Sequence, residues 1–144
     1  YSNSLIATSN DYKLFKKTKL NRSLNRHRYS EKEINSKLNV KTTISHKIFN
    51  KLIKILDIRK KQKAFHPNAK RLNINLGSKL FCFKRISLDK KQSIISITNC
   101  SSINQYPKLD QKYCKWKNII NPKIKSLNKS LKLKPFETMW LSNI

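Results

Sequence analysis

Apolar residues recur along this chain at two different spacings, three and four residues before residue 70 and two residues after it. The first spacing is typical of an amphipathic helix, and it extends from Ser45 to Lys63 with lysines on the opposite face. Pro67 disfavours helical geometry at His66, so the helix should end before that point.

The part before this helix contains one clear helix signal. Residues 1–29 are polar and irregular, end in a dense cluster from Asn21 to Tyr29, and predict a long ordered loop. Ser30 and Glu33 have the S-x-x-E spacing of a capping box, in which each side chain accepts from the free backbone N–H of the other residue. We therefore expect a short helix that begins at Ser30 and fades near Asn39.

Alternation with a period of two predicts β-strands in the second half of the chain. The expected strands are Leu72–Leu76, Leu80–Ser87, Ser93–Thr98, Ser130–Lys134 and Phe136–Ser142. The first two form a hairpin around a turn at residues 77–78, and residues 100–128, with two prolines, are expected to be loop. The predicted fold class is α+β, with a small antiparallel sheet of about five strands.

Composition excludes several classes of protein. Leu, Ile, Val and Phe make up 40 of the 144 residues, well above the roughly 20% below which a highly charged chain stays disordered. Apolar runs are far shorter than the roughly 20 residues of a membrane span, and no leader precedes them. Three cysteines without a C-x-x-C pair favour the reducing cytoplasm. Because the chain begins at Tyr1 and its one methionine is Met139, we expect a fragment or processed product.

The net charge of +26 raises the possibility of a nucleic-acid partner, because lysine and arginine neutralise phosphates. The charge is nevertheless spread evenly, with +6 on residues 1–29, +7 on residues 30–66 and +13 on residues 67–144. Lysine outnumbers arginine by 27 to 6, whereas bidentate phosphate and base recognition favours arginine. A basic RNA-binding or ribosome-associated protein is therefore kept as the alternative function.

The residues that could carry chemistry are few. Among the seven carboxylates only Asp11 lies in a stretch that looks like a site, and the three histidines have no metal-ligand spacing. A single glycine rules out a phosphate-cradling loop or a G-x-S-x-G elbow. We expect no catalytic residue, metal or cofactor in the chain. The cluster from Arg22 to His27 fits either a solvated basic loop or a clamp for an anion or sugar hydroxyls.

Several separate motifs, in order, resemble the sucrose phosphorylases and their relatives in the α-amylase clan, glycoside hydrolase family 13. The pattern after the eighth barrel strand in that family is similar to SLLGTxND…T…R.INRHxY…E, although Ala7 stands here where glycine is usual. The similarity is greatest to the branch of glucosylglycerate and sucrose 6'-phosphate phosphorylases. The matching segments are YSNSLIATSND (1–11), KKTKLNRSLNRHRYSEKEI (16–34), IRKKQKAFHPNA (58–69), LGSKLFCFKRIS (76–87), QSIISITNCSS (92–102) and LKPFETMWLSN (133–143).

The resemblance implies the end of a (β/α)8 barrel followed by a small antiparallel β domain. Residues 1–66 would be the loop after strand 8, a short helix and the last barrel helix, and residues 67–144 the C-terminal β domain. The family's catalytic carboxylates lie on barrel strands upstream of Tyr1, so this chain alone is expected to be inactive. The missing N-terminal barrel of the same protein is then its expected partner.

The resemblance also implies a reaction. Enzymes of this branch use phosphate to cleave an α-glucoside such as sucrose or glucosylglycerate, giving α-glucose 1-phosphate by a retaining double displacement. Arg22 would bind the glucosyl unit of the substrate, whereas Asp11, Arg26 and His27 would support the loop. The implied substrates are a small sugar and inorganic phosphate, with no metal, organic cofactor, membrane or nucleic acid involved.

Overall fold

The computed structural model describes residues 2–113, 115–122 and 131–144, in two compact units, Tyr1–Asp57 and Ile58–Ile144. The division into a barrel end (1–66) and a β domain (67–144), which the resemblance implies, stays a prediction. The residues that follow the long helix are tied to the second unit, because the Arg85 Nε–H donates to the Ala64 carbonyl (3.1 Å) and the Ala64 N–H donates to Gln92 Oε1 (2.9 Å).

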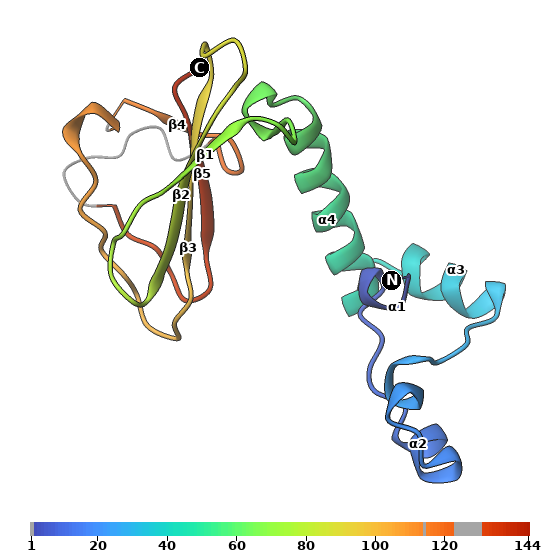
Figure 1. The fold of residues 1–144 in the computed structure, drawn as a ribbon. Coiled ribbons are helices and arrows are strands. Elements are labelled where there is room, and N and C mark those ends of the chain that lie inside the picture. The colour runs from blue at the N-terminus through green and yellow to red at the C-terminus, as the bar shows by residue number, and fades with distance from the viewer. Residues whose placement is uncertain (1, 114, 123–130) are drawn as a thin grey trace. The chain divides into compact units, whose positions relative to one another are not determined.

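The first unit is helical (Figure 1). Its elements are α1 (Ser2–Leu5), α2 (Tyr12–Thr18), a 3-10 helix (Asn21–Asn25), α3 (Glu31–Asn39) and most of α4 (Ile44–Lys60). The prediction of a loop over residues 1–29 is therefore wrong. These helices have at most two turns, too few for apolar periodicity to show, and α2 is set by the local cap at Asp11.

The two helices predicted after this segment are confirmed. Ser30 is the N-cap of α3, and its N–H donates to Glu33 Oε2 (2.7 Å) while the Glu33 N–H donates to Ser30 Oγ (3.3 Å). α4 ends at Lys60, three residues before its predicted end, and a 3-10 turn over Lys63–Phe65 follows it ahead of Pro67. The capping box therefore acts as its spacing predicts.

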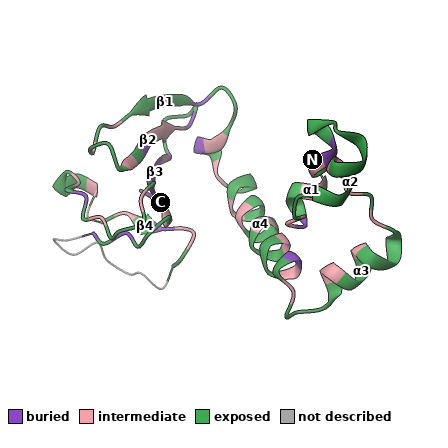
Figure 2. Ribbon diagram, turned by 90° about the horizontal axis from the view of Figure 1, so that it is seen from below, coloured by how far each residue is buried: buried purple, intermediate pink, exposed green. Residues whose placement is uncertain are grey.

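α4 carries apolar side chains that are largely uncovered. Ile44 is 69% exposed, and Ile48, Ile53 and Leu56 are each 41% exposed. Ser45 is the one buried residue of this helix, and Figure 2 shows exposed and intermediate positions along nearly all of it. The apolar residues of this helix are therefore not part of a packed core.

The second unit is built on one antiparallel sheet of five strands in the order β1-β2-β3-β5-β4 (Figure 1). Its strands are β1 (Lys70–Asn73), β2 (Leu80–Ile86), β3 (Ser93–Asn99), β4 (Lys117–Asn118) and β5 (Thr138–Ser142). The α+β class and the small antiparallel sheet are therefore confirmed.

Two strand assignments need correction. β4 lies inside the predicted loop 100–128, which also holds a 3-10 turn (Gln111–Tyr113). The predicted strand Ser130–Lys134 is wrong over residues 131–134, where Leu133 makes a single bridge to Gln105, and Ser130 lies outside the described residues. Leu131 and Leu133 alternate with lysines as strand residues would, but they are loop residues whose side chains enter the core.

The predicted hairpin is confirmed, with a shorter first strand. β1 ends at Asn73, and Ile74 and Leu76 continue as non-strand residues that pack against the core. Gly77 has a φ of +100°, a conformation that favours glycine, and its carbonyl accepts from the Leu80 N–H (3.2 Å). The loop is thus longer than the tight turn predicted.

One face of the sheet supplies the hydrophobic core. Side chains from β2, β3 and β5 meet two leucines from the segment before β5, and Trp116 and Tyr113 pack at the edge of this cluster. The buried members are Cys82, Ile95, Ile97, Leu131, Leu133, Met139 and Leu141. Burial raises the pKa of the Cys82 thiol to about 11, so this cysteine stays a neutral core residue.

Candidate functional site

Asp11 is the centre of the polar network in the first unit. Its Oδ1 accepts from the Leu14 N–H (2.9 Å) as the N-cap of α2, and its Oδ2 lies 3.1 Å from His27 Nδ1. Its own N–H donates to the Leu24 carbonyl (2.6 Å). The Leu14 N–H, and after it the His27 ring, lower the pKa of the Asp11 carboxyl, which favours the ionised form.

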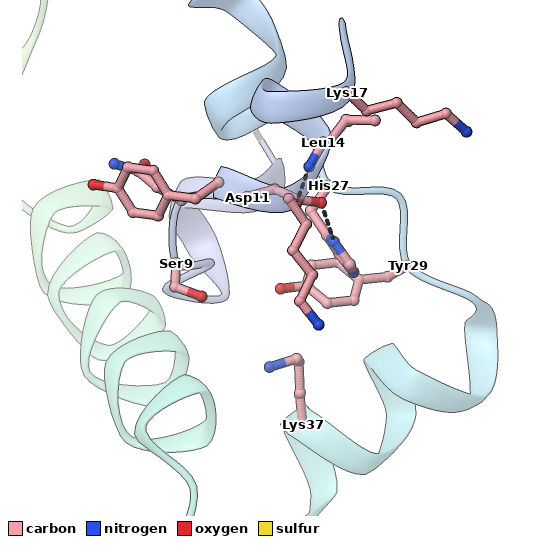
Figure 3. Close-up of a pocket in the computed structure, with 10 residues that line it drawn as sticks. Ser9, Asp11, Leu14, Lys17, His27, Tyr29 and Lys37 are labelled. Carbon is pink, nitrogen blue, oxygen red and sulfur yellow. Dashed lines mark hydrogen bonds and ion pairs between the residues drawn. The ribbon is translucent and has the colours of Figure 1, made fainter.

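The ionised Asp11 carboxylate determines which nitrogen of His27 carries the proton in this contact. A carboxylate only accepts hydrogen bonds, so the proton of the contact belongs to His27 Nδ1. The Tyr29 ring lies beside it with centroids 4.3 Å apart, and Lys37 Nζ lies 5.2 Å from the centre of the Tyr29 ring. Figure 3 shows His27, Tyr29 and Lys37 around a common space.

That space is an open hollow of about 760 Å³, which we call the α2–α3 hollow. Residues of α2, of the segment around His27 and Tyr29, and Lys37 of α3 line it, and its charged residues are three lysines and one aspartate besides His27. Its lining is Ser9, Asn10, Asp11, Tyr12, Lys13, Leu14, Lys17, His27, Tyr29 and Lys37. The charged side chains of the lining therefore carry an excess of positive charge.

Side chains upstream hold the segment from Asn21 to His27 in place. The Asn3 amide Nδ2 donates to the carbonyls of Asn25 (3.0 Å) and His27 (3.1 Å). The Thr18 hydroxyl donates to Ser23 Oγ (2.7 Å), and Ser23 is buried. The loop is thus fixed mostly through its backbone.

The structure brings two of the four sequence-predicted site residues together. Asp11 and His27 are paired beside the α2–α3 hollow, whereas Arg22 and Arg26 have exposed side chains and are not among the residues that line it. Arg26 follows the 3-10 helix, where its N–H donates to the Ser23 carbonyl (3.4 Å). Arg22 therefore presents its guanidinium outward from the surface of this unit.

Sequence reasoning missed Asn3, Lys37 and Tyr29 as members of this region. Asn3 lies in a run of polar residues like many others in the chain, and Lys37 is one of 27 lysines. Of these three residues, only Lys37 lies in a segment that the sequence predicts to be a helix. Within the described part of the chain, no group of three or more metal-ligating side chains is present, and no helix is long and apolar enough to cross a bilayer.

Comparison with known proteins shows similarity over almost the whole chain. No family model matches. The chain is 25% identical over 141 residues, 98% of its length, to glucosylglycerate phosphorylase from Escherichia coli strain K12. The similarity to a glucosylglycerate phosphorylase, in the branch that the sequence motifs resemble, is confirmed. The chain spans about a quarter of the length of that relative (24%).

Solved structures show the same fold. The maltogenic amylase from S. marinus matches 68% of this chain and 12% of its own, with a TM-score of 0.51 and 24% identity. Trehalose-6-phosphate hydrolase from Bacillus licheniformis matches 73% of this chain and 19% of its own, with a TM-score of 0.52 and 15% identity. The chain is therefore similar in sequence to a glycoside phosphorylase, and its fold is found as a part of these two solved enzymes.

Proposed function

We propose that this chain is the C-terminal part of a glycoside phosphorylase that uses phosphate to cleave an α-glucoside such as sucrose or glucosylglycerate. The observation that carries the proposal is the similarity to glucosylglycerate phosphorylase over 98% of the chain. The reaction is a retaining double displacement that yields α-glucose 1-phosphate. Its catalytic carboxylates belong to a barrel outside this sequence, so the chain alone is inactive and the barrel is its partner.

The way in which the loop is built supports a role in substrate binding. Asn3, Asp11 and Thr18 fix the backbone around Arg22, while the Arg22 side chain remains exposed. A guanidinium carries five N–H donors in a rigid plane, which suits the hydroxyls of a glucosyl unit. In the proposed enzyme Arg22 contacts that unit, and Asp11, Arg26 and His27 maintain the loop.

The uncovered apolar side chains of α4 support the proposed partner. A soluble domain rarely leaves a contiguous apolar surface open unless another surface covers it. Ile44 and Ile48 lie four residues apart, on one face of α4, and are 69% and 41% exposed. A barrel's last helix has one face that packs on the barrel strands, and these two isoleucines fit that requirement.

The decisive experiment uses the complete protein that contains this chain and measures phosphate-dependent release of α-glucose 1-phosphate from a panel of glucosides. We expect Arg22→Ala to lower kcat/KM by about 100-fold or more, because a charge-assisted contact to the substrate is lost. Arg28→Ala is the matched control, since Arg28 is an exposed arginine in the same segment. It should retain near wild-type activity.

Two results would contradict the proposal. Absence of any phosphate-dependent product from the complete protein would reject phosphorolysis as its reaction. Wild-type activity of Arg22→Ala would reject the role of Arg22 while leaving the reaction in place. Product formed with water and not with phosphate would instead assign the chain to a hydrolase of the same clan.

A further inference from the structure

The α2–α3 hollow has a charge that the loop-support role of its residues does not explain. Lys13 and Lys17 on α2 and Lys37 on α3 line it, and its one carboxylate is Asp11. That carboxylate accepts hydrogen bonds from the Leu14 N–H and from His27 and stays negatively charged. Three lysines against one carboxylate still leave the lining with an excess of two positive charges, not counting His27, and Glu33 of α3 also interacts electrostatically with Lys37.

The hollow also offers oriented hydrogen-bond donors. Lys37 is half-buried and lies 5.2 Å from the centre of the Tyr29 ring, and Figure 3 shows its side chain directed toward Tyr29 while Lys17 points away. Lys13, also in the lining, comes from a different helix. Two ammonium groups from separate helices and a phenol hydroxyl can thus approach one ligand from different sides.

We propose that the α2–α3 hollow binds a small phosphate-type oxyanion, either inorganic phosphate or the phosphoryl group of a sugar phosphate. Lys37 and Lys13 provide the positive charge, and the Tyr29 hydroxyl donates a hydrogen bond. Lysine acts on phosphate as a point charge with three donors and needs no fixed plane, unlike arginine. The choice of phosphate among oxyanions rests on the proposed function, whereas the preference for an anion rests on the lining alone.

The test titrates the 144-residue chain at constant ionic strength and follows the NMR signals of Tyr29 and His27. The probes are inorganic phosphate, α-glucose 1-phosphate and glucose. We expect saturable shifts with at least one phosphate-containing probe and none with glucose. Saturation by phosphate alone assigns the site to the free ion, and tighter binding of α-glucose 1-phosphate assigns it to a phosphorylated sugar.

Two variants that each remove one positive charge distinguish binding at a specific site from general attraction of anions to a basic chain. Lys37→Met should weaken binding by about tenfold, the loss expected for one charge-assisted contact. Lys32→Met, an exposed position on the same helix, removes the same charge and should change binding less than twofold. Lys37→Arg should restore most of the affinity, and circular dichroism should show α3 intact in each variant.

The proposal is overturned if no probe saturates, or if Lys32→Met and Lys37→Met weaken binding equally. Its failure is distinguishable from failure of the proposed function. If the chain binds phosphate through Lys37 but the complete protein releases no α-glucose 1-phosphate, the phosphate site stands and the phosphorylase assignment is rejected. If the complete protein carries out phosphorolysis and Lys37→Met leaves phosphate binding unchanged, the phosphorylase assignment stands and the phosphate site is rejected.

Discussion

Asn99 is the residue whose replacement tests the fold of the sheet unit most directly. It is the last residue of β3 and is fully buried. Its Nδ2 donates to the carbonyls of Ile103 (2.7 Å) and Lys134 (2.9 Å), and its Oδ1 accepts from the N–H (3.0 Å) and the hydroxyl (2.7 Å) of Ser101. One side chain therefore joins the strand end to two separate loops.

The expected cost of Asn99→Leu follows from these bonds. Leucine has the branching of asparagine but is larger, so no cavity forms, and overpacking of this buried site adds to the loss of the hydrogen bonds. Four bonds at a net value near 1 kcal/mol each, partly compensated where water reaches the loops, give a loss of about 3 kcal/mol. That is a large share of the roughly 5–15 kcal/mol that holds an ordinary domain together.

The assay is urea unfolding of the whole chain followed by tryptophan fluorescence, since Trp116 and Trp140 both belong to the sheet unit. Asn104→Leu, at an exposed position in the next loop, is the control and should change stability by less than about 0.5 kcal/mol. Asn99→Asp keeps the acceptor but turns a carboxylate oxygen toward two carbonyl oxygens in a buried site, so it should cost at least as much as Asn99→Leu at neutral pH. A loss below about 1 kcal/mol for Asn99→Leu would refute the role given to these bonds.

Two further predictions concern charge. The Ser87 hydroxyl, then the Lys91 N–H and Lys63, lower the pKa of Asp89 to about 2, so its stabilising contribution is complete above pH 4 and is lost as the pH falls toward 2. Asp89→Asn should flatten the loss of stability between pH 4 and 2 in acid titrations followed by circular dichroism, and an unchanged acid profile would contradict this. RNA binding measured by fluorescence anisotropy should fall steeply with salt and vanish at moderate salt, because the charge is spread evenly. Binding that persists there would favour the RNA-binding alternative.

Features that depend on neighbours in the chain were predictable from sequence. The capping box at Ser30 joins residues three apart, so its spacing was sufficient to place the start of α3. The hairpin of β1 and β2 is equally local, and alternation revealed it. In both cases the residues that decide the structure are close in sequence, three positions apart in the capping box and at most 16 apart in the paired strands.

Features that depend on distant partners were not predictable. β4 is two residues long and exists because Lys117 and Asn118 pair with β5, more than twenty residues later. Leu131 and Leu133 alternate like a strand but enter the core from a loop, so the same pattern had a different cause. In the site, no spacing rule links Asp11 to His27, so the sequence drew attention to both residues but did not predict that they are paired.

The way in which the Arg22 segment is held bears on how the proposed function should be tested. Asn3 and Asp11 bond to backbone carbonyls of this segment, and Thr18 bonds to the Ser23 hydroxyl. None of these bonds ends on the Arg22 guanidinium, so Arg22→Ala should leave the loop in place. A loss of activity with unchanged His27 and Tyr29 NMR signals would then report a lost substrate contact. Asn3→Ala removes the support, and should shift those signals and weaken catalysis together.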